Sequence, residues 1–165
     1  LDDCVPSKTF IASTWLRTEL RRAPRLGFEI DIDDAKIDLP QIHDRVRRLA
    51  SEQSADIAEQ LRNVGVKLVC GRGELVDPTP GLARHRLRAT APDGTVTEHD
   101  ADFVLIATGA SPRVLPSAQP DGERILTWRQ LYDLKTLPEH LIVVGSGVTG
   151  AEFVHAYTEL GVQVS

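Results

Sequence analysis

A cysteine and a lysine near the start of the chain have a spacing that could support redox chemistry. Cys4 lies two residues before Pro6, which is well placed to begin a helix, and Lys8 follows within the first turns. The positive helix end and the charge of Lys8 would favour the thiolate form of Cys4. Asp2 and Asp3 oppose this effect, because adjacent negative charge disfavours a thiolate. From these residues alone, a redox role for Cys4 and an incidental one both remain open.

A second group of residues could bind the pyrophosphate of a nucleotide. Gly145, Gly147 and Gly150 form the pattern G-x-G-x-x-G between an apolar run and a segment with helical apolar spacing. The first glycine allows a tight turn, the second lets backbone N–H groups approach an anion, and the third lets helix and strand pack closely. The residues expected to contact the nucleotide are Gly145, Ser146, Gly147, Val148, Thr149 and Gly150. An ordinary glycine-rich turn is the alternative.

The sequence does not distinguish NAD from NADP. The acidic residue that binds the adenosine ribose lies ~20 residues beyond the glycines, at the end of the second strand. That position comes after Ser165, the last residue of the chain.

Two amphipathic helices are expected to position the N-terminal residues. The first should begin at Pro6 and end near Arg22, and the second should run from about Pro40 to Asn63. The apolar residues expected on their buried faces are Phe10, Ile11, Trp15, Leu16 and Leu20 in the first, and Ile42, Val46, Leu49, Ile57 and Leu61 in the second. His43 lies beside the second stripe with no partner at metal-ligand spacing, so no metal site is expected.

The middle of the chain changes to the period of two that is typical of strands. Residues 67–70 are expected to form a strand, 71–73 a turn, and 86–91 and 95–99 an antiparallel pair. Within this meander Cys70 would be a buried, inert thiol. A buried strand is also expected over 102–107.

The last third of the chain should return to a nucleotide-binding fold. Thr127 is expected to cap a short helix that ends at Leu134. A buried strand at 141–144, the glycine turn, a helix capped at Gly161 and a second parallel strand from Val162 should then follow.

Composition excludes several classes of function. The chain has 165 residues and a net charge of −5 with scattered basic residues, which argues against nucleic-acid binding. No apolar run approaches the ~20 residues that a membrane span needs. Two cysteines do not make a disulfide scaffold, so a cytoplasmic location is expected. The chain has no methionine and stops inside a nucleotide fold, which we interpret as a piece of a longer protein.

Three motifs resemble successive landmarks of the flavoprotein (pyridine nucleotide–disulfide) oxidoreductases, the family that includes lipoamide dehydrogenase and glutathione reductase. They are C-V-P-S-K at residues 4–8, I-A-T-G-A-S-P at 106–112 and L-I-V-V-G-S-G-V-T-G-A-E at 141–152. Their order and spacing match across essentially the whole chain. The resemblance implies an α/β, Rossmann-like fold that binds FAD and NAD(P)H and carries a small antiparallel β-meander.

The same resemblance implies roles for individual residues. Cys4 matches the cysteine that lies against the flavin, Lys8 the lysine near flavin N5, and Glu152 the glutamate that pairs with that lysine. Such a pair would hold positive charge where the reduced flavin develops negative charge. The positions that match backbone contacts to FAD are Gly73, Thr108, Gly109 and Ala110.

Domain organisation also follows from the resemblance. Residues 1–112 would belong to an FAD-binding domain without its first βαβ unit, 113–138 would cross between domains, and 139–165 would begin an NAD(P)-binding domain. A homodimer is implied, with its contacts and the acid–base residues outside this chain.

The chain departs from the family at its active disulfide, C-x-N-x-G-C. Leu1 stands at the asparagine position and Asp3 at the glycine position, and the first cysteine would precede Leu1. The sequence D-D-C-V-P-S-K resembles that of an actinobacterial branch of NAD(P)H–quinone reductases that lacks this first cysteine.

We therefore expect an enzyme that passes a hydride from NAD(P)H to flavin and then electrons to a small-molecule acceptor, a quinone. A dihydrolipoamide dehydrogenase-type dithiol/disulfide oxidoreductase is one alternative. A non-catalytic nucleotide-binding module, in which Cys4 and Lys8 would be incidental, is another. The isolated chain is expected to be inactive in either enzymatic case.

Overall fold

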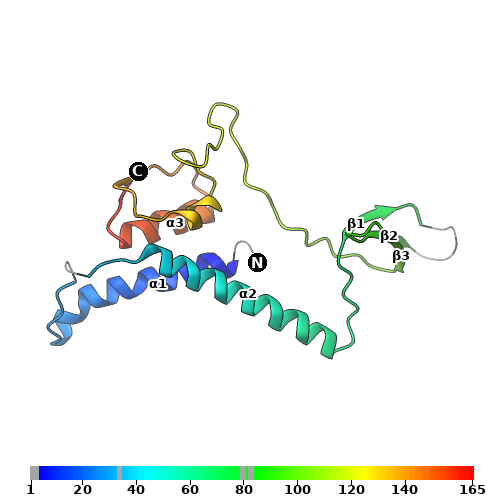
Figure 1. The fold of residues 1–165 in the computed structure, drawn as a ribbon, viewed down its shortest axis with the longest axis horizontal. Helices are drawn as coiled ribbons and strands as arrows, with labels where there is room; N and C mark the ends of the chain where they lie inside the picture. The colour runs from blue at the N-terminus through cyan, green and yellow to red at the C-terminus, as the bar shows by residue number, and fades with distance from the viewer. Residues whose placement is uncertain (1–3, 33–34, 79–80, 82–83) are drawn as a thin grey trace. The chain divides into compact units, whose positions relative to one another are not determined.

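A computed structural model describes residues 4–32, 35–78, 81 and 84–165. The chain divides into two compact units, one formed by Leu1–Ala55 with Pro112–Ser165 and the other by Asp56–Ser111. We call them unit 1 and unit 2 and describe each by itself (Figure 1).

Two long helices form the N-terminal part of unit 1. Helix α1 spans Cys4–Arg22 and continues into a short 3₁₀ helix, η1, at Ala23–Leu26. Helix α2 spans Leu39–Asn63, and its last turns belong to unit 2. The Asp38 carboxylate accepts a 2.9 Å hydrogen bond from the backbone N–H of Gln41, which caps α2. Both predicted helices are confirmed, although α1 begins two residues earlier than expected because Pro6 lies inside its first turn.

The buried face of α1 differs from the predicted one. Ser7, Phe10 and Thr14 are buried, whereas Trp15 and Leu16 are 45% and 59% exposed. The two hydroxyls can be buried because each donates to a carbonyl one turn earlier, Thr14 Oγ1 to the Ile11 oxygen at 3.0 Å. The apolar spacing therefore predicted Phe10 correctly, but it predicted a buried face that includes Trp15 and Leu16, whereas the observed one includes Ser7 and Thr14.

Helix α2 buries only its first half. Leu39, His43, Val46 and Ala50 are buried, but Ile57 is 47% exposed. The prediction for Val46 is confirmed and that for Ile57 is wrong, because residues beyond 55 leave the core of unit 1.

The C-terminal part of unit 1 is a β–α–β segment. Strand β4 (His140–Leu141) pairs in parallel with β5 (Gln163–Val164), and helix α3 (Val148–Glu159) joins them. Gly161, at φ +90°, ends α3 in a Schellman motif, in which the Val162 N–H donates to the Tyr157 oxygen. The predicted strand–turn–helix–strand order is confirmed. The first strand is not the buried one expected at 141–144, because β4 ends at Leu141 and Ile142 and Val144 are 68% and 80% exposed.

The core of unit 1 lies where α1, α2, α3 and the 3₁₀ helix η2 (Gln130–Asp133) meet. The expected short helix is present as one 3₁₀ turn, but its N-cap is Arg129 and not Thr127 as predicted. Thr127 instead donates from its backbone N–H and its hydroxyl to the side-chain oxygen of Gln130. The buried apolar residues of this core are Phe10, Leu39, Val46, Leu131, Tyr132, Phe153, Ala156, Tyr157, Leu160 and Val162.

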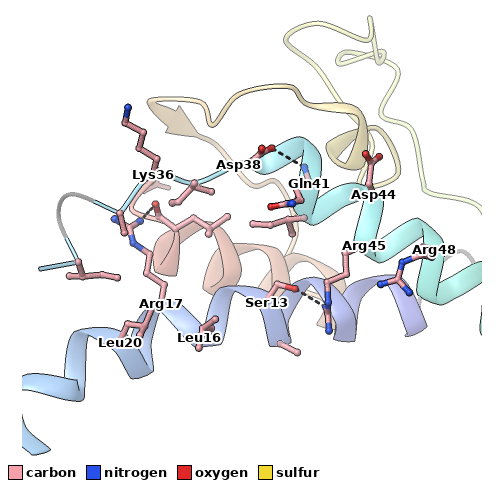
Figure 2. A pocket seen from close by; sticks show the side chains of 16 residues that line it. Ser13, Leu16, Arg17, Leu20, Lys36, Asp38, Gln41, Asp44, Arg45 and Arg48 are labelled. Carbon is pink, nitrogen blue, oxygen red and sulfur yellow. Dashed lines mark hydrogen bonds between the residues drawn. The ribbon is translucent and has the colours of Figure 1, made fainter. Parts of the chain in front are cut away.

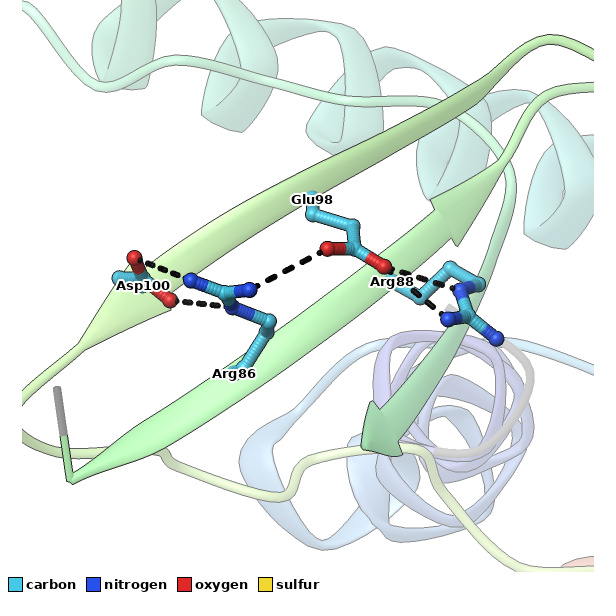
Figure 3. A network of polar contacts seen from close by, with 4 residues as sticks. All are labelled: Arg86, Arg88, Glu98 and Asp100. Atoms are coloured by element: carbon cyan, nitrogen blue, oxygen red, sulfur yellow. Dashed lines mark hydrogen bonds and ion pairs between the residues drawn. The ribbon is translucent and has the colours of Figure 1, made fainter. Parts of the chain in front are cut away.

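Unit 2 contains the predicted antiparallel meander. Its strands are β1 (Arg72–Val76), β2 (His85–Thr90) and β3 (Val96–Ala101), in the order β1-β2-β3. Arg86 lies opposite Asp100 and Arg88 opposite Glu98, and Figure 3 shows the resulting ladder of ion pairs. This alternation of charge fixes the register of β2 against β3.

Two expectations for unit 2 are wrong. Residues 67–70 and 102–107 are not strands, and within them Cys70 is exposed and Phe103 is 85% exposed. A strand buried on both faces needs neighbouring strands for its backbone groups, and no described residue pairs with these segments.

His43 gives the fold a testable pH dependence. Burial, then the nearby Arg47, lowers the pKa of His43, and its Nε2 has no hydrogen-bond partner among the described residues. Above the unfolded pKa of about 6.5 the ring is neutral in both states; below it, the unfolded state takes up a proton that the folded state resists. The free energy of unfolding should therefore decrease as the pH falls from about 6.5 to 5.

We use "full-length protein" for the polypeptide that contains these residues. In that protein, His43→Leu should reduce the pH dependence of the free energy of unfolding. Denaturant unfolding at several pH values measures it, and His155→Gln, at an exposed position, is the control. An unchanged slope in His43→Leu would contradict the assignment.

Candidate nucleotide and redox site

The loop between β4 and α3 has the backbone geometry of an anion site. Gly145 has φ +131°, and Gly147 is the N-cap of α3 in an extended conformation. The Gly147 oxygen accepts the 3.0 Å hydrogen bond from the Ala151 N–H. No side chain caps this helix end, so its first N–H groups face outward, as a pyrophosphate site requires.

Gly150 is required by packing. A Cβ at this position would lie 2.5 Å from the Gly145 carbonyl oxygen, closer than real Cβ atoms come. Gly147, in contrast, has no atom within 4 Å of its Cβ position, so its lack of a side chain leaves open space above the loop. The glycine residues therefore fit a bound dinucleotide, with Gly150 closing the loop and Gly147 leaving it accessible.

Helices α1 and α3 pack side by side and run in the same direction (Figure 1). Near their N-terminal ends Lys8 Nζ forms an ion pair with Glu152. At their C-terminal ends Arg17 donates to the Leu160 carbonyl oxygen and the Thr18 hydroxyl donates to Glu159. The N-terminal end of α1 and the glycine loop consequently lie at the same end of the helix pair.

Aromatic packing fills the space between these polar contacts. The ring of Phe10 lies 6.1 Å from that of Phe153 and 5.6 Å from that of Tyr157, measured between centroids. Burial raises the pKa of the Tyr157 phenol well above its usual value, so this side chain stays neutral. The core thus supports α1 directly beneath the residues that the resemblance assigns to redox chemistry.

The ion pair between Lys8 and Glu152 confirms an expected contact, but it contributes little to the stability of the fold. The Lys8 side chain is 64% exposed and that of Glu152 is 20% exposed. Exposed pairs of this kind contribute about 0–1 kcal/mol. The ion pair therefore serves to orient Lys8, because it holds the ammonium group near the N-terminal end of α3, beside the glycine loop.

Cys4 is the first residue of α1, whereas the sequence had placed it two residues before the helix. It is an exposed free cysteine, and its spacing of four residues puts it on the same helix face as Lys8. Asp2 and Asp3, which were expected to oppose thiolate formation, lie outside the described residues, as does Leu1.

The remaining candidates lie in unit 2. Gly73 is part of strand β1, paired with Ala89, and not of the expected turn. The strand extends back to Arg72 because β2 offers partners along its whole length. Thr108, Gly109 and Ala110 form an irregular segment in which Gly109 has φ +78°. Glycine adopts this left-handed conformation without the steric cost of a Cβ.

Sequence reasoning missed Arg17 and Thr18. Their contacts with α3 join residues 143 and 141 positions apart, and no local pattern signals them. Figure 2 shows Arg17 extending from α1 above Leu16, in the same groove in which Arg45 binds Ser13.

The described part of the chain lacks two other features. No helix in it is long and apolar enough to cross a membrane. It also holds no cluster of three or more His, Cys, Asp or Glu side chains suited to a metal ion.

Two glycine substitutions in the full-length protein should separate packing from binding. Gly150→Ala forces the loop open and should lower both the melting temperature and the affinity for the dinucleotide, the latter at least tenfold. Gly147→Ala meets open space and should leave the melting temperature within a few degrees while weakening binding. Thermal unfolding and titration with the dinucleotide measure both; equal affinity in Gly147→Ala and the wild type would contradict the assigned role.

Known proteins are similar to this chain over essentially its whole length. The chain is 78% identical over 165 residues to a Mycobacterium tuberculosis protein named NAD(P)H dehydrogenase (quinone), of which it covers 34%. It is 33% identical over 162 residues to the dihydrolipoyl dehydrogenase of Chlorobaculum tepidum, again covering 33% of that protein. The chain thus spans about a third of the length of these relatives.

A solved structure agrees with the fold. The crystal structure of LpdA from Mycobacterium tuberculosis superposes with a TM-score of 0.87 at 75% sequence identity, covering 99% of this chain and 34% of that one. The family described as pyridine nucleotide-disulphide oxidoreductase matches residues 1–165. The chain is accordingly a member of the pyridine nucleotide-disulphide oxidoreductase family, with an α/β fold and a small antiparallel sheet.

Proposed function

We propose that the full-length protein is an FAD-dependent oxidoreductase that takes a hydride from NAD(P)H and passes electrons to a quinone. The observation that carries this proposal is the ion pair between Lys8 on α1 and Glu152 on α3, at the same end as the glycine loop. The 78% identity to a protein named NAD(P)H dehydrogenase (quinone) supports the same conclusion.

Residues 139–165 would hold the pyridine nucleotide. The backbone of Gly145–Gly150 binds its pyrophosphate at the N-terminal end of α3, where the helix dipole favours negative charge. In this assignment residues 139–165 begin the NAD(P) domain, 113–138 cross to it, and 1–112 belong to the FAD domain.

The full-length protein would bind FAD, which when bound supplies the hydride-accepting chemistry that no side chain has. Gly73 and the segment Thr108–Ala110 offer backbone contacts, and the left-handed Gly109 allows the chain a close approach. Lys8 keeps a positive charge where negative charge develops during hydride transfer, and Glu152 fixes its position.

The acceptor distinguishes the two enzymatic proposals. A dithiol enzyme needs a cysteine partner for Cys4, and the family pattern places that partner before Leu1 and not at Cys70. The position of Cys4 at the start of α1 and the 33% identity to a dihydrolipoyl dehydrogenase favour the dithiol enzyme as the second candidate. The higher identity to a quinone-reducing relative favours direct electron transfer to quinone.

A non-catalytic nucleotide-binding module explains less. It gives no reason for a lysine and a glutamate from separate helices to meet beside the glycine loop. We further propose, from the resemblance, a homodimer in the cytoplasm with its contacts outside this chain; sedimentation of the full-length protein tests the dimer.

Replacing the thiol tests the quinone proposal. Cys4→Ser in the full-length protein should keep quinone reduction by NAD(P)H within about threefold of wild type, because no cysteine pair takes part. Steady-state turnover with a soluble benzoquinone measures this. A loss of a hundredfold or more would favour the dithiol alternative.

Lys8→Met provides the contrasting variant. Removing the ammonium group should slow the reduction of the flavin by NAD(P)H by about ten- to a hundredfold, since one preorganised charge is lost. Stopped-flow absorbance under anaerobic conditions measures this step separately from quinone reduction. A wild-type rate in Lys8→Met would contradict the proposed role of the ion pair.

A further inference from the structure

Helices α1 and α3 form polar contacts at both ends, and the two sets of contacts constrain the helices to different degrees. At the N-terminal end, the ammonium group of Lys8 pairs with Glu152, and the Lys8 side chain is 64% exposed. Such a pair is readily exchanged for water and cannot by itself fix how far one helix slides along another. Something else must set the axial position of α1 on α3 if Lys8 is to stay opposite Glu152.

The C-terminal end supplies that constraint. Arg17 donates from α1 to the carbonyl oxygen of Leu160, the C-cap residue of α3, and Thr18 donates to Glu159. The last carbonyls of a helix lack partners within the helix, and a cation near that end interacts favourably with its dipole. We call Arg17 and Thr18, with Glu159 and Leu160, the C-terminal clamp.

Gly161 allows this clamp to close. A Cβ on Gly161 would lie 2.9 Å from Nη1 of Arg17, so any larger residue would push the guanidinium away. The Schellman turn of α3 and the approach of Arg17 therefore use the same glycine. Phe10 packs against Tyr157 with 5.6 Å between the ring centroids. Because protein cores are close-packed, this contact couples the position of the clamp to that of the rest of α1.

We propose that Arg17 and Thr18 are positioning residues that set the register of α1 on α3 and thereby hold Lys8 opposite Glu152. This inference rests on the proposed function, in which Lys8 acts on the flavin. Nine residues of helix separate Lys8 from Arg17, about 14 Å along the axis. The charge of Arg17 is therefore largely screened from the redox centre at physiological salt, and its effect passes through the position of Lys8.

The test uses the midpoint potential of the flavin in the full-length protein, measured by spectroelectrochemistry, together with the melting temperature. Lys8→Met should lower the equilibrium constant for two-electron reduction about tenfold, which corresponds to about 30 mV. Arg17→Gln should lower it about threefold, and Arg17→Lys should restore more than half of this loss. Thr18→Val, which removes only one hydroxyl, gives the same direction of change if Arg17→Gln does not fold.

Two comparisons separate positioning from general stability. Arg17→Gln combined with Lys8→Met should lower the potential no further than Lys8→Met alone, because both act through one ammonium group. Arg45→Gln removes another arginine bonded to α1, at Ser13, and should leave the potential at the wild-type value.

The possible failures are distinguishable. If Lys8→Met leaves the potential unchanged, the proposed role of Lys8 is wrong, and the inference falls with it. If Lys8→Met lowers the potential but Arg17→Gln and Thr18→Val do not, only the clamp is wrong. The clamp is also overturned if the effects of Arg17→Gln and Lys8→Met simply add, or if Arg45→Gln lowers the potential as much.

Discussion

The packing of Phe10 between α1 and α3 is the interaction on which the rest of the candidate site depends. Its ring contacts Phe153 and Tyr157 on α3, His43 on α2 and Tyr132 on η2. One aromatic side chain of α1 thus contacts α2, α3 and η2. Because the two helix N-termini lie at one end of this core, the thiol of Cys4, the Lys8 ammonium and the glycine loop share that end.

The glycine loop imposes a second constraint of a different kind. The constraint is that these glycines lack a Cβ. At Gly150 a Cβ would collide with the backbone at Gly145, and at Gly147 it would occupy open space. The loop is therefore closely packed where helix meets strand and accessible where an anion would bind. Together with the core contact and the proposed C-terminal clamp, this lets a weak, exposed ion pair have a defined geometry without being a source of stability.

Local patterns were sufficient to predict the parts of the fold that local forces determine. The glycine turn, the C-cap at Gly161 and the antiparallel pairing of residues 86–91 with 95–99 each follow from residues near one another in sequence. The family resemblance added the contact between Lys8 and Glu152, which are 144 positions apart.

The failures have a common physical cause, since burial depends on distant partners. Residues 102–107 are apolar enough for a buried strand, yet no described strand pairs with them. Cys70 is exposed for the same reason. On α1, spacing suggested Trp15 as buried, while α3 covers the face with Thr14, whose hydroxyl is satisfied within its own helix.

The most direct test of the proposed function is an anaerobic titration of the full-length protein with NADH or NADPH, followed by visible absorbance. The account predicts direct bleaching to reduced flavin, with no long-wavelength band, and rapid reoxidation by a quinone. A long-wavelength band at two-electron reduction would show a thiolate in contact with oxidised flavin. That result would mean that Cys4 has a working cysteine partner, and it would replace the quinone proposal with the dithiol one.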